Sequence, residues 1–194
     1  MKLLEILEHD PRAPLVFTSG TFFLFFTIFV AVFAFARSAR ARFACVLVFS
    51  LFYYYKCNGL FMAALGVGAL GDYWAARLIA RETRAFAKKA LLAGSIALSL
   101  SLLLYFKYAN FILANFGLLS GRAVHPLAIF LPVGISFYTF ESISYVVDVY
   151  RGDCEPAETF LEYAFFLVYF PHSVAGPIVR ARDLLSQIRR MPEA

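Results

Sequence analysis

The stretch FTSGTFFLFFTIFVAVFAFA, residues 17–36, contains no charged side chain. About 20 apolar residues in a helix cross the hydrocarbon core of a bilayer, which is about 30 Å thick. The run is longer than the apolar core of a usual signal peptide, and residues 1–16 hold more acidic than basic side chains. We therefore expect a retained membrane helix. Cleavage after Ala34-Phe35-Ala36 is the alternative.

The composition of the whole chain points the same way. Hydrophobic residues make up 61% of it and charged residues 16%, with 23 Phe and 11 Tyr. Soluble domains are about 45–50% apolar and about 25% charged. The net charge of +5 comes from Lys and Arg clustered at the ends of apolar runs, which suits lipid headgroups rather than nucleic acid. We expect an all-α polytopic membrane protein with membrane lipid, and no nucleic acid, among its partners.

Further apolar runs divide the chain into helices. We expect an outside tail at 1–16 and five spans at 17–36, 43–55, 60–80, 90–108 and 127–150. The basic stretches at 37–42 and 77–89 should be cytoplasmic, and the acidic N-terminus outside. Counting spans from an outside N-terminus places both basic stretches inside, so the two arguments agree. The expected location is the bacterial inner (plasma) membrane.

The segment 160–178 does not fit a simple span. Its apolar part is short, and Pro171, Gly176 and Pro177 free backbone groups that lipid cannot satisfy. Several arginines follow it. We expect a broken or re-entrant helix, followed by a short interfacial helix at 181–190 with an apolar edge of Leu184, Leu185 and Ile188.

Polar side chains recur on one face of the fifth span. Gly134, Tyr138, Glu141, Tyr145 and Asp148 follow a spacing of 4, 3, 4, 3. Such a face is a poor lipid contact, so it lines either an interhelical hydrogen-bond network or a substrate path.

Three other ionisable residues are candidates for a site or for ion pairs. Arg151 is placed to pair with Asp148 three residues earlier. Asp72 is expected near a membrane edge, paired with Arg77. His172, beside Pro171, could act as a general base or serve a structural or channel-lining role. No phosphate loop, nucleophile elbow or His-Glu-x-x-His motif occurs in the sequence, so we expect no metal and no cofactor.

The longest motif runs from Leu131 to Gly152: Leu131-Pro132-Val133-Gly134-Ile135-Ser136-Phe137-Tyr138-Thr139-Phe140-Glu141-Ser142-Ile143-Ser144-Tyr145, then Val147-Asp148-Val149-Tyr150-Arg151-Gly152. It resembles a signature of the membrane-bound O-acyltransferase family, in the branch of alginate O-acetyltransferases and the lipoteichoic-acid D-alanyl transfer protein. Three more segments resemble family segments: Phe170-Pro171-His172 with Ala175-Gly176-Pro177-Ile178, then Tyr105–Phe111, then the Phe17–Phe26 start.

This resemblance implies many helices around a thinned funnel, and acyl transfer from a cytoplasmic donor to an outer acceptor. Family members carry a catalytic histidine in a Trp-His-Gly type motif. Here Trp74 is not followed by histidine, and His9, His125 and His172 lie elsewhere. We therefore assign no catalytic residue. Tyr138, Glu141, Tyr145, Asp148, Arg151 and His172 are substrate-channel candidates.

The sequence thus predicts the N-terminal part of an O-acyltransferase that acylates, and typically acetylates, a cell-surface polysaccharide or related polymer. The acyl donor, such as acyl-CoA or an acyl carrier protein, would be a substrate, and a periplasmic or extracellular acetyltransferase a partner. Residues 1–194 alone are expected to be inactive. The alternative is a non-catalytic membrane scaffold or acyl-transport component that works with an outer-face acetyltransferase.

Overall fold

The protein is built from helices alone wherever its structure is described. The computed structural model describes residues 15, 17–121, 124–173 and 179–189, and in these it contains no strand. The helices are α2 (Gly20–Phe35), α3 (Ala39–Asn58), α4 (Phe61–Arg81), α5 (Ala85–Leu103), a π-helical turn η1 (Leu104–Tyr108), α6 (Ala109–Ser120), α7 (Ile135–Arg151), α8 (Phe160–Val168), α9 (Phe170–Ser173) and α10 (Ala181–Arg189). The predicted all-α class is confirmed for this part of the chain.

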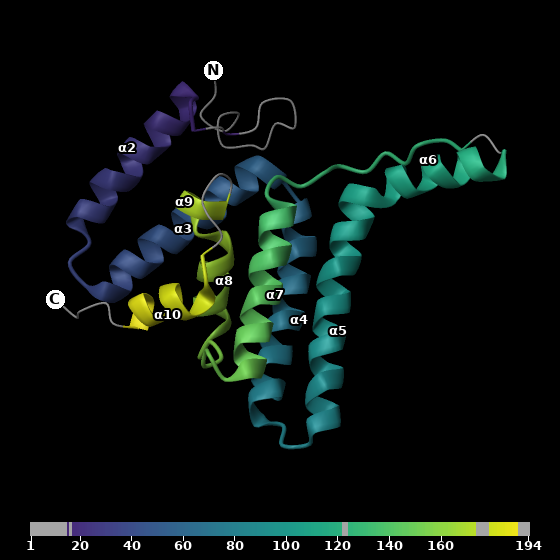
Figure 1. Ribbon diagram of the computed structural model, residues 1–194. Helices are drawn as coiled ribbons and strands as arrows, with labels where there is room; N and C mark the ends of the chain where they lie inside the picture. Colours follow the sequence, from purple (N-terminus) through teal and green to yellow (C-terminus); the bar gives the residue numbers. More distant parts are fainter. Residues whose placement is uncertain (1–14, 16, 122–123, 174–178, 190–194) are drawn as a thin grey trace.

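Two groups of helices organise the chain (Figure 1). In the first, α4, α5 and α7 pack side by side. In the second, α2 and α3 pack against each other, and α8 joins them to the first group through contacts with α3, α4 and α7. The main core lies between α3, α4, α7 and α8 and contains the fully buried Tyr145, Tyr163 and Phe166.

Local signals explain where several helices begin. Ser19 precedes α2 and Ser38 precedes α3, and each serine hydroxyl accepts a backbone N–H three residues later, at 3.1 and 3.2 Å. Thr159 does the same for α8 by accepting the Glu162 amide at 3.2 Å. A short polar side chain at this position satisfies an amide that the helix itself cannot.

Helix α7 begins later than the sequence predicted. The expected span starts at residue 127, whereas the helix starts at Ile135. Pro132 offers no amide to a helix, and Gly134 has φ 80°, a left-handed conformation that interrupts helical backbone. Residues 124–134 instead run as a non-helical segment held by Asn110, which donates to the Leu127 carbonyl at 3.0 Å and accepts the Leu127 amide at 2.8 Å.

The expected fourth span, 90–108, is part of a longer helical stretch. Helix starts at Ala85, passes through the π turn and continues as α6 to Ser120. Figure 1 shows α6 leaving the bundle at an angle to α5. The stretch Ala85–Ser120 is long and apolar enough to cross a membrane, and it is the one helix in the described residues that meets both criteria.

The helix in segment 160–178 is broken. α8 ends at Val168, Tyr169 is non-helical, and α9 restarts at Phe170. The interruption places the Phe170 amide against Ser50 of α3, whose buried hydroxyl accepts it at 3.2 Å. A side chain from another helix thus satisfies a backbone donor that the break leaves without a helical partner. Residues 174–178 of the predicted segment lie outside the described residues.

The apolar edge of helix α10, which the sequence analysis expected at the membrane interface, packs against the protein core. Leu185 is buried, and Leu184 and Ile188 pack against the main core. The helix contacts α7 and α8.

Candidate functional site

The polar face of α7 is buried inside the protein. Tyr138, Glu141, Tyr145 and Asp148 are all at most 7% exposed. The Tyr138 hydroxyl donates to the Leu65 carbonyl of α4 at 2.6 Å, and the Tyr145 hydroxyl accepts the Ala157 amide at 2.9 Å. These contacts tie α7 to its neighbours, as expected of an interhelical network. A substrate path along this face stays a prediction.

Arg151 and Asp148 do not form the predicted ion pair. Arg151 lies exposed at the last turn of α7. Asp148 is buried, and its Oδ2 has no hydrogen-bond partner among the described residues. The Asp148 backbone carbonyl accepts the amides of Asp153 and Cys154 at 2.9 and 3.3 Å, which turns the chain sharply after Gly152. The backbone of His172 belongs to α9, and its side chain lies outside what the structure describes.

Asp72 is the centre of a buried cluster that the sequence analysis did not predict. The carboxylate is 1% exposed and accepts hydrogen bonds from Ser95 at 2.5 Å and Ser99 at 3.0 Å, both on α5. Ser142 of α7 donates to the same carboxylate, and its hydroxyl lies 3.1 Å from that of Tyr163 on α8. Four helices therefore meet at one acidic side chain, which we call the Asp72 cluster.

Arg77, the predicted partner of Asp72, points elsewhere. Its guanidinium donates to the carbonyls of Ala157 and Glu158 at 3.1 and 2.7 Å and to the Tyr73 hydroxyl at 3.1 Å. Residues five apart do not share a helix face, whereas Ser95 and Ser99, four apart, do. Ser95 and Ser99, four apart in the mostly apolar second half of α5, were the sequence signal that could have indicated the cluster.

The Asp72 cluster can hold helices together but lacks the parts of a hydrolytic triad. Each serine hydroxyl is committed to a carboxylate, and no histidine takes part among the described residues. Charge-assisted hydrogen bonds of this kind are the stronger ones, and a bilayer offers no water to replace them. The cluster therefore positions α4, α5, α7 and α8.

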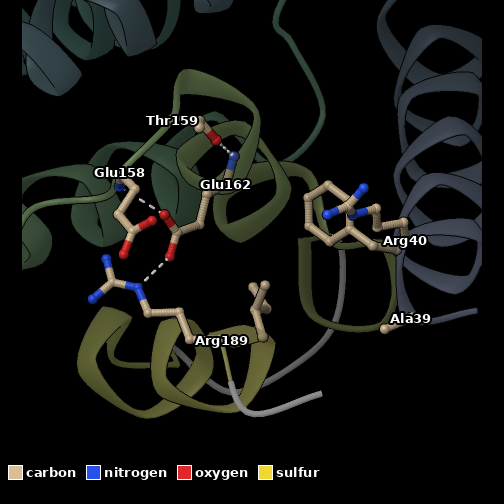
Figure 2. A pocket seen from close by; sticks show the side chains of 8 residues that line it. Ala39, Arg40, Glu158, Thr159, Glu162 and Arg189 are labelled. Atoms are coloured by element: carbon tan, nitrogen blue, oxygen red, sulfur yellow. Dashed lines mark hydrogen bonds and ion pairs between the residues drawn. The ribbon is translucent and has the colours of Figure 1, made fainter. Parts of the chain in front are cut away.

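Charged segments from distant parts of the sequence gather at one end of the bundle. Arg77 of α4 contacts the 157–158 backbone, and Lys88 of α5 lies over the ring of Tyr150, 5.4 Å from its centre. Arg189 of α10 donates to Glu162 at 2.7 Å and contacts Glu155 at 3.3 Å. This end also holds a cavity of about 310 Å³ between α3, α8 and α10 (Figure 2).

This cavity has both charged and apolar walls. Arg40 and Phe43 of α3 line it, together with Glu158 and Glu162 near the start of α8 and Arg189 of α10. Of the predicted channel residues whose side chains the structure describes, none lines this cavity. No group of three or more histidine, cysteine or acidic side chains placed to hold a metal ion occurs in the described residues.

Comparison with known proteins finds relatives over most of the chain. The chain is 38% identical over 182 residues to the probable alginate O-acetylase AlgI of Pseudomonas putida, and 37% identical over 182 residues to that of Pseudomonas aeruginosa. Each match covers 89% of this chain. The chain belongs to the membrane-bound O-acyltransferase family. A peptidoglycan O-acetyltransferase of Helicobacter pylori is 30% identical over 165 residues, which cover 72% of the chain.

The chain spans about a third of the length of these family members: the matches cover 37%, 34% and 31% of the three relatives. No family model and no solved structure matches it significantly. Family membership and the long apolar helix together indicate an all-α membrane protein.

Proposed function

We propose that this chain takes part in O-acyl transfer to a cell-surface polysaccharide or related polymer, with acetyl as the acyl group. The observation that carries the proposal is the 38% identity over 89% of the chain to an alginate O-acetylase. The acyl donor is a substrate, such as acyl-CoA or an acyl carrier protein, and no prosthetic group takes part. An outer-face acetyltransferase is the expected partner.

The proposal includes the topology predicted from the sequence. The chain lies in the bacterial inner membrane, crosses it with five spans and a broken helix, and has its N-terminus outside. The gathering of Arg40, Arg77, Lys88 and Arg189 at one end of the molecule supports this arrangement, because clustered basic residues favour the cytoplasmic side. The Phe170–Ser50 hydrogen bond supports a broken helix at membrane depth.

A chimera tests the function. The 182 residues that match this chain in the P. putida alginate O-acetylase are replaced by their counterparts from this chain, and the chimera is expressed in a strain that lacks its own enzyme. We expect O-acetyl esters in the alginate, measured by alkaline release of acetate. A chimera present in the membrane at the level of the parent enzyme, yet yielding no acetyl esters, would contradict the proposal and favour a scaffold.

Cysteine labelling tests the topology separately. Single cysteines at the exposed positions Gln187 and Val124 should differ, with 187 labelled only after the membrane is opened and 124 labelled from outside. Labelling of 187 from outside in intact cells would overturn the proposed orientation.

A further inference from the structure

Two cavities lie side by side at the end of the molecule where the charged segments gather. The first is the cavity of Figure 2, lined by Arg40, Glu158, Glu162 and Arg189, which we call the polar cavity. The second, also about 310 Å³, lies between α2, α3, α8 and α10, and we call it the apolar cavity. Ala39 and Ile188 line both, so the cavities share a wall.

Most of the side chains that line the apolar cavity are aliphatic or aromatic. Phe33, Val46, Phe165, Tyr169 and Leu184 line it, together with the polar side chains of Arg42 and Gln187. Arg42 donates from Nε to the Ala36 carbonyl at 3.1 Å. The five apolar side chains can accommodate an alkyl chain.

The charges of the polar cavity are only partly paired. Glu162 accepts Arg189 Nε at 2.7 Å and the Glu158 amide at 2.7 Å, so its carboxylate is satisfied. Arg40 and the Glu158 side chain have no ion-pair partner within the described chain. Figure 2 shows Glu158, Glu162 and Arg189 together on one side and Arg40 on the other. The charge of Glu158 also acts on the nearby Arg189. This side of the cavity therefore carries two negative groups and one positive group, and it faces the positive Arg40.

We propose that this pair of cavities binds a zwitterionic phospholipid, with its phosphate at Arg40, its ammonium group at Glu158 and part of an acyl chain in the apolar cavity. A headgroup with one charge of each sign matches the cationic Arg40 on one side of the cavity and the net negative charge of Glu158, Glu162 and Arg189 on the other. A headgroup that is purely anionic would offer no cation to the two carboxylates of the cavity, Glu158 and Glu162. The location agrees with a membrane interface, so the inference rests on the membrane placement in the proposed function.

Helix α10 is anchored to the bundle and also forms a wall of both cavities. Ile188 packs against the main core while lining both cavities, and Arg189 anchors the same turn through Glu162. A lipid bound there would connect α3, α8 and α10 and fill space that side chains leave open.

Native mass spectrometry of the purified chain in detergent tests the proposal. The probes are phosphatidylethanolamine and phosphatidylglycerol with identical acyl chains. We expect the wild type to retain phosphatidylethanolamine at least fivefold better than phosphatidylglycerol. Arg40→Gln should lower retention of both lipids at least fivefold, because both carry the phosphate. Glu158→Gln should lower retention of phosphatidylethanolamine alone and remove the preference.

Two further variants keep the test sharp. Ile188→Trp should lower the retention of both lipids, because the larger side chain fills the shared wall, and circular dichroism checks that the variant keeps its helices. Arg37→Gln is the matched control, since Arg37 is exposed in the same basic stretch and lines neither cavity.

Equal retention of the two lipids by the wild type would overturn the proposal. So would unchanged retention in Arg40→Gln or in Glu158→Gln. The measurement requires no acyl transfer, so a failed chimera with intact lipid selectivity would refute the proposed function and leave the lipid site standing.

Discussion

Ser95 of α5 donates a hydrogen bond of 2.5 Å to Oδ1 of Asp72 on α4, and both side chains are buried. Ser99 and Ser142 bind the other carboxylate oxygen. One acidic group thus satisfies three hydroxyls from two other helices. Removing it leaves all three without their acceptor.

Asp72→Ala should lower the free energy of unfolding by about 2–4 kcal/mol. A buried hydrogen bond to a charged group contributes about 1.5–3 kcal/mol, and some of the loss is recovered when serines turn to carbonyls in their own helices. Asp72→Asn keeps an acceptor and should cost about 1 kcal/mol. Thermal unfolding in detergent measures both.

Asp153→Ala, at an exposed position, is the control. An equal effect of Asp153→Ala and Asp72→Ala on the unfolding free energy would contradict the role of the cluster.

Gly68→Ala should destabilise the packing of α4 against α5 and α7. A Cβ at residue 68 would lie 2.8 Å from Leu102 Cδ1 and 3.0 Å from the Tyr138 hydroxyl. Leu102 can shift, but Tyr138 is held by its 2.6 Å bond to the Leu65 carbonyl. We expect a loss of about 1–3 kcal/mol in unfolding free energy.

Gly66→Ala is the matched control for this substitution. It lies on the same helix, and its added Cβ would meet nothing within 4 Å. Alanine there should leave stability unchanged or raise it by up to about 1 kcal/mol. Equal unfolding temperatures for Gly66→Ala and Gly68→Ala would show that the close approach at residue 68 does not matter.

Arg189→Ala should loosen α10. It removes the ion pair with Glu162, whose side chain is 9% exposed, and leaves that carboxylate with the Glu158 amide alone. We expect a local loss of about 1–3 kcal/mol and faster hydrogen exchange over residues 181–189.

Arg182→Ala provides the comparison on the same helix. Its ion pair with Asp183 is 3.5 Å long between side chains 47% and 60% exposed. Exposed pairs contribute about 0–1 kcal/mol. If both variants changed the exchange rates equally, the Arg189–Glu162 contact would not be what anchors α10.

Cys154 should react slowly with iodoacetamide at neutral pH. Burial raises the pKa of its thiol to about 11, and the Asp148 carboxylate adds to this shift while Arg189 opposes it. The thiolate is the reactive form, so a raised pKa means less of it at pH 7. The rate should rise about tenfold for each pH unit between 7 and 10.

The control is an exposed cysteine at position 151, the last residue of α7 and three residues before Cys154. In a Cys154→Ser background, the iodoacetamide reaction rate of Arg151→Cys should level off near the ordinary thiol pKa of about 8.5. Peptide mass spectrometry separates these sites from Cys45 and Cys57. A Cys154 rate that levels off near pH 9 would contradict the raised pKa.

Periodicity within one helix was predictable, whereas contacts between helices were not. The spacing of Tyr138, Glu141, Tyr145 and Asp148 placed them on one face, because helix geometry depends only on local sequence. The partners of that face, such as the Leu65 carbonyl, come from 73 residues away. The predicted Asp72–Arg77 ion pair was wrong because the partners of Asp72 are also distant in sequence. The serines that bind its carboxylate lie 23, 27 and 70 residues away.

The sequence by itself determined the helical class, the membrane character and the family, because apolar length, proline positions and motif residues act locally. It also indicated that segment 160–178 could not be one continuous helix. Only the tertiary structure decided that Ser50 receives the Phe170 amide, that Asp72 binds serines rather than Arg77, and that Arg40 faces Glu158 across a cavity. A buried polar group must find a partner, and which one it meets depends on how the helices pack.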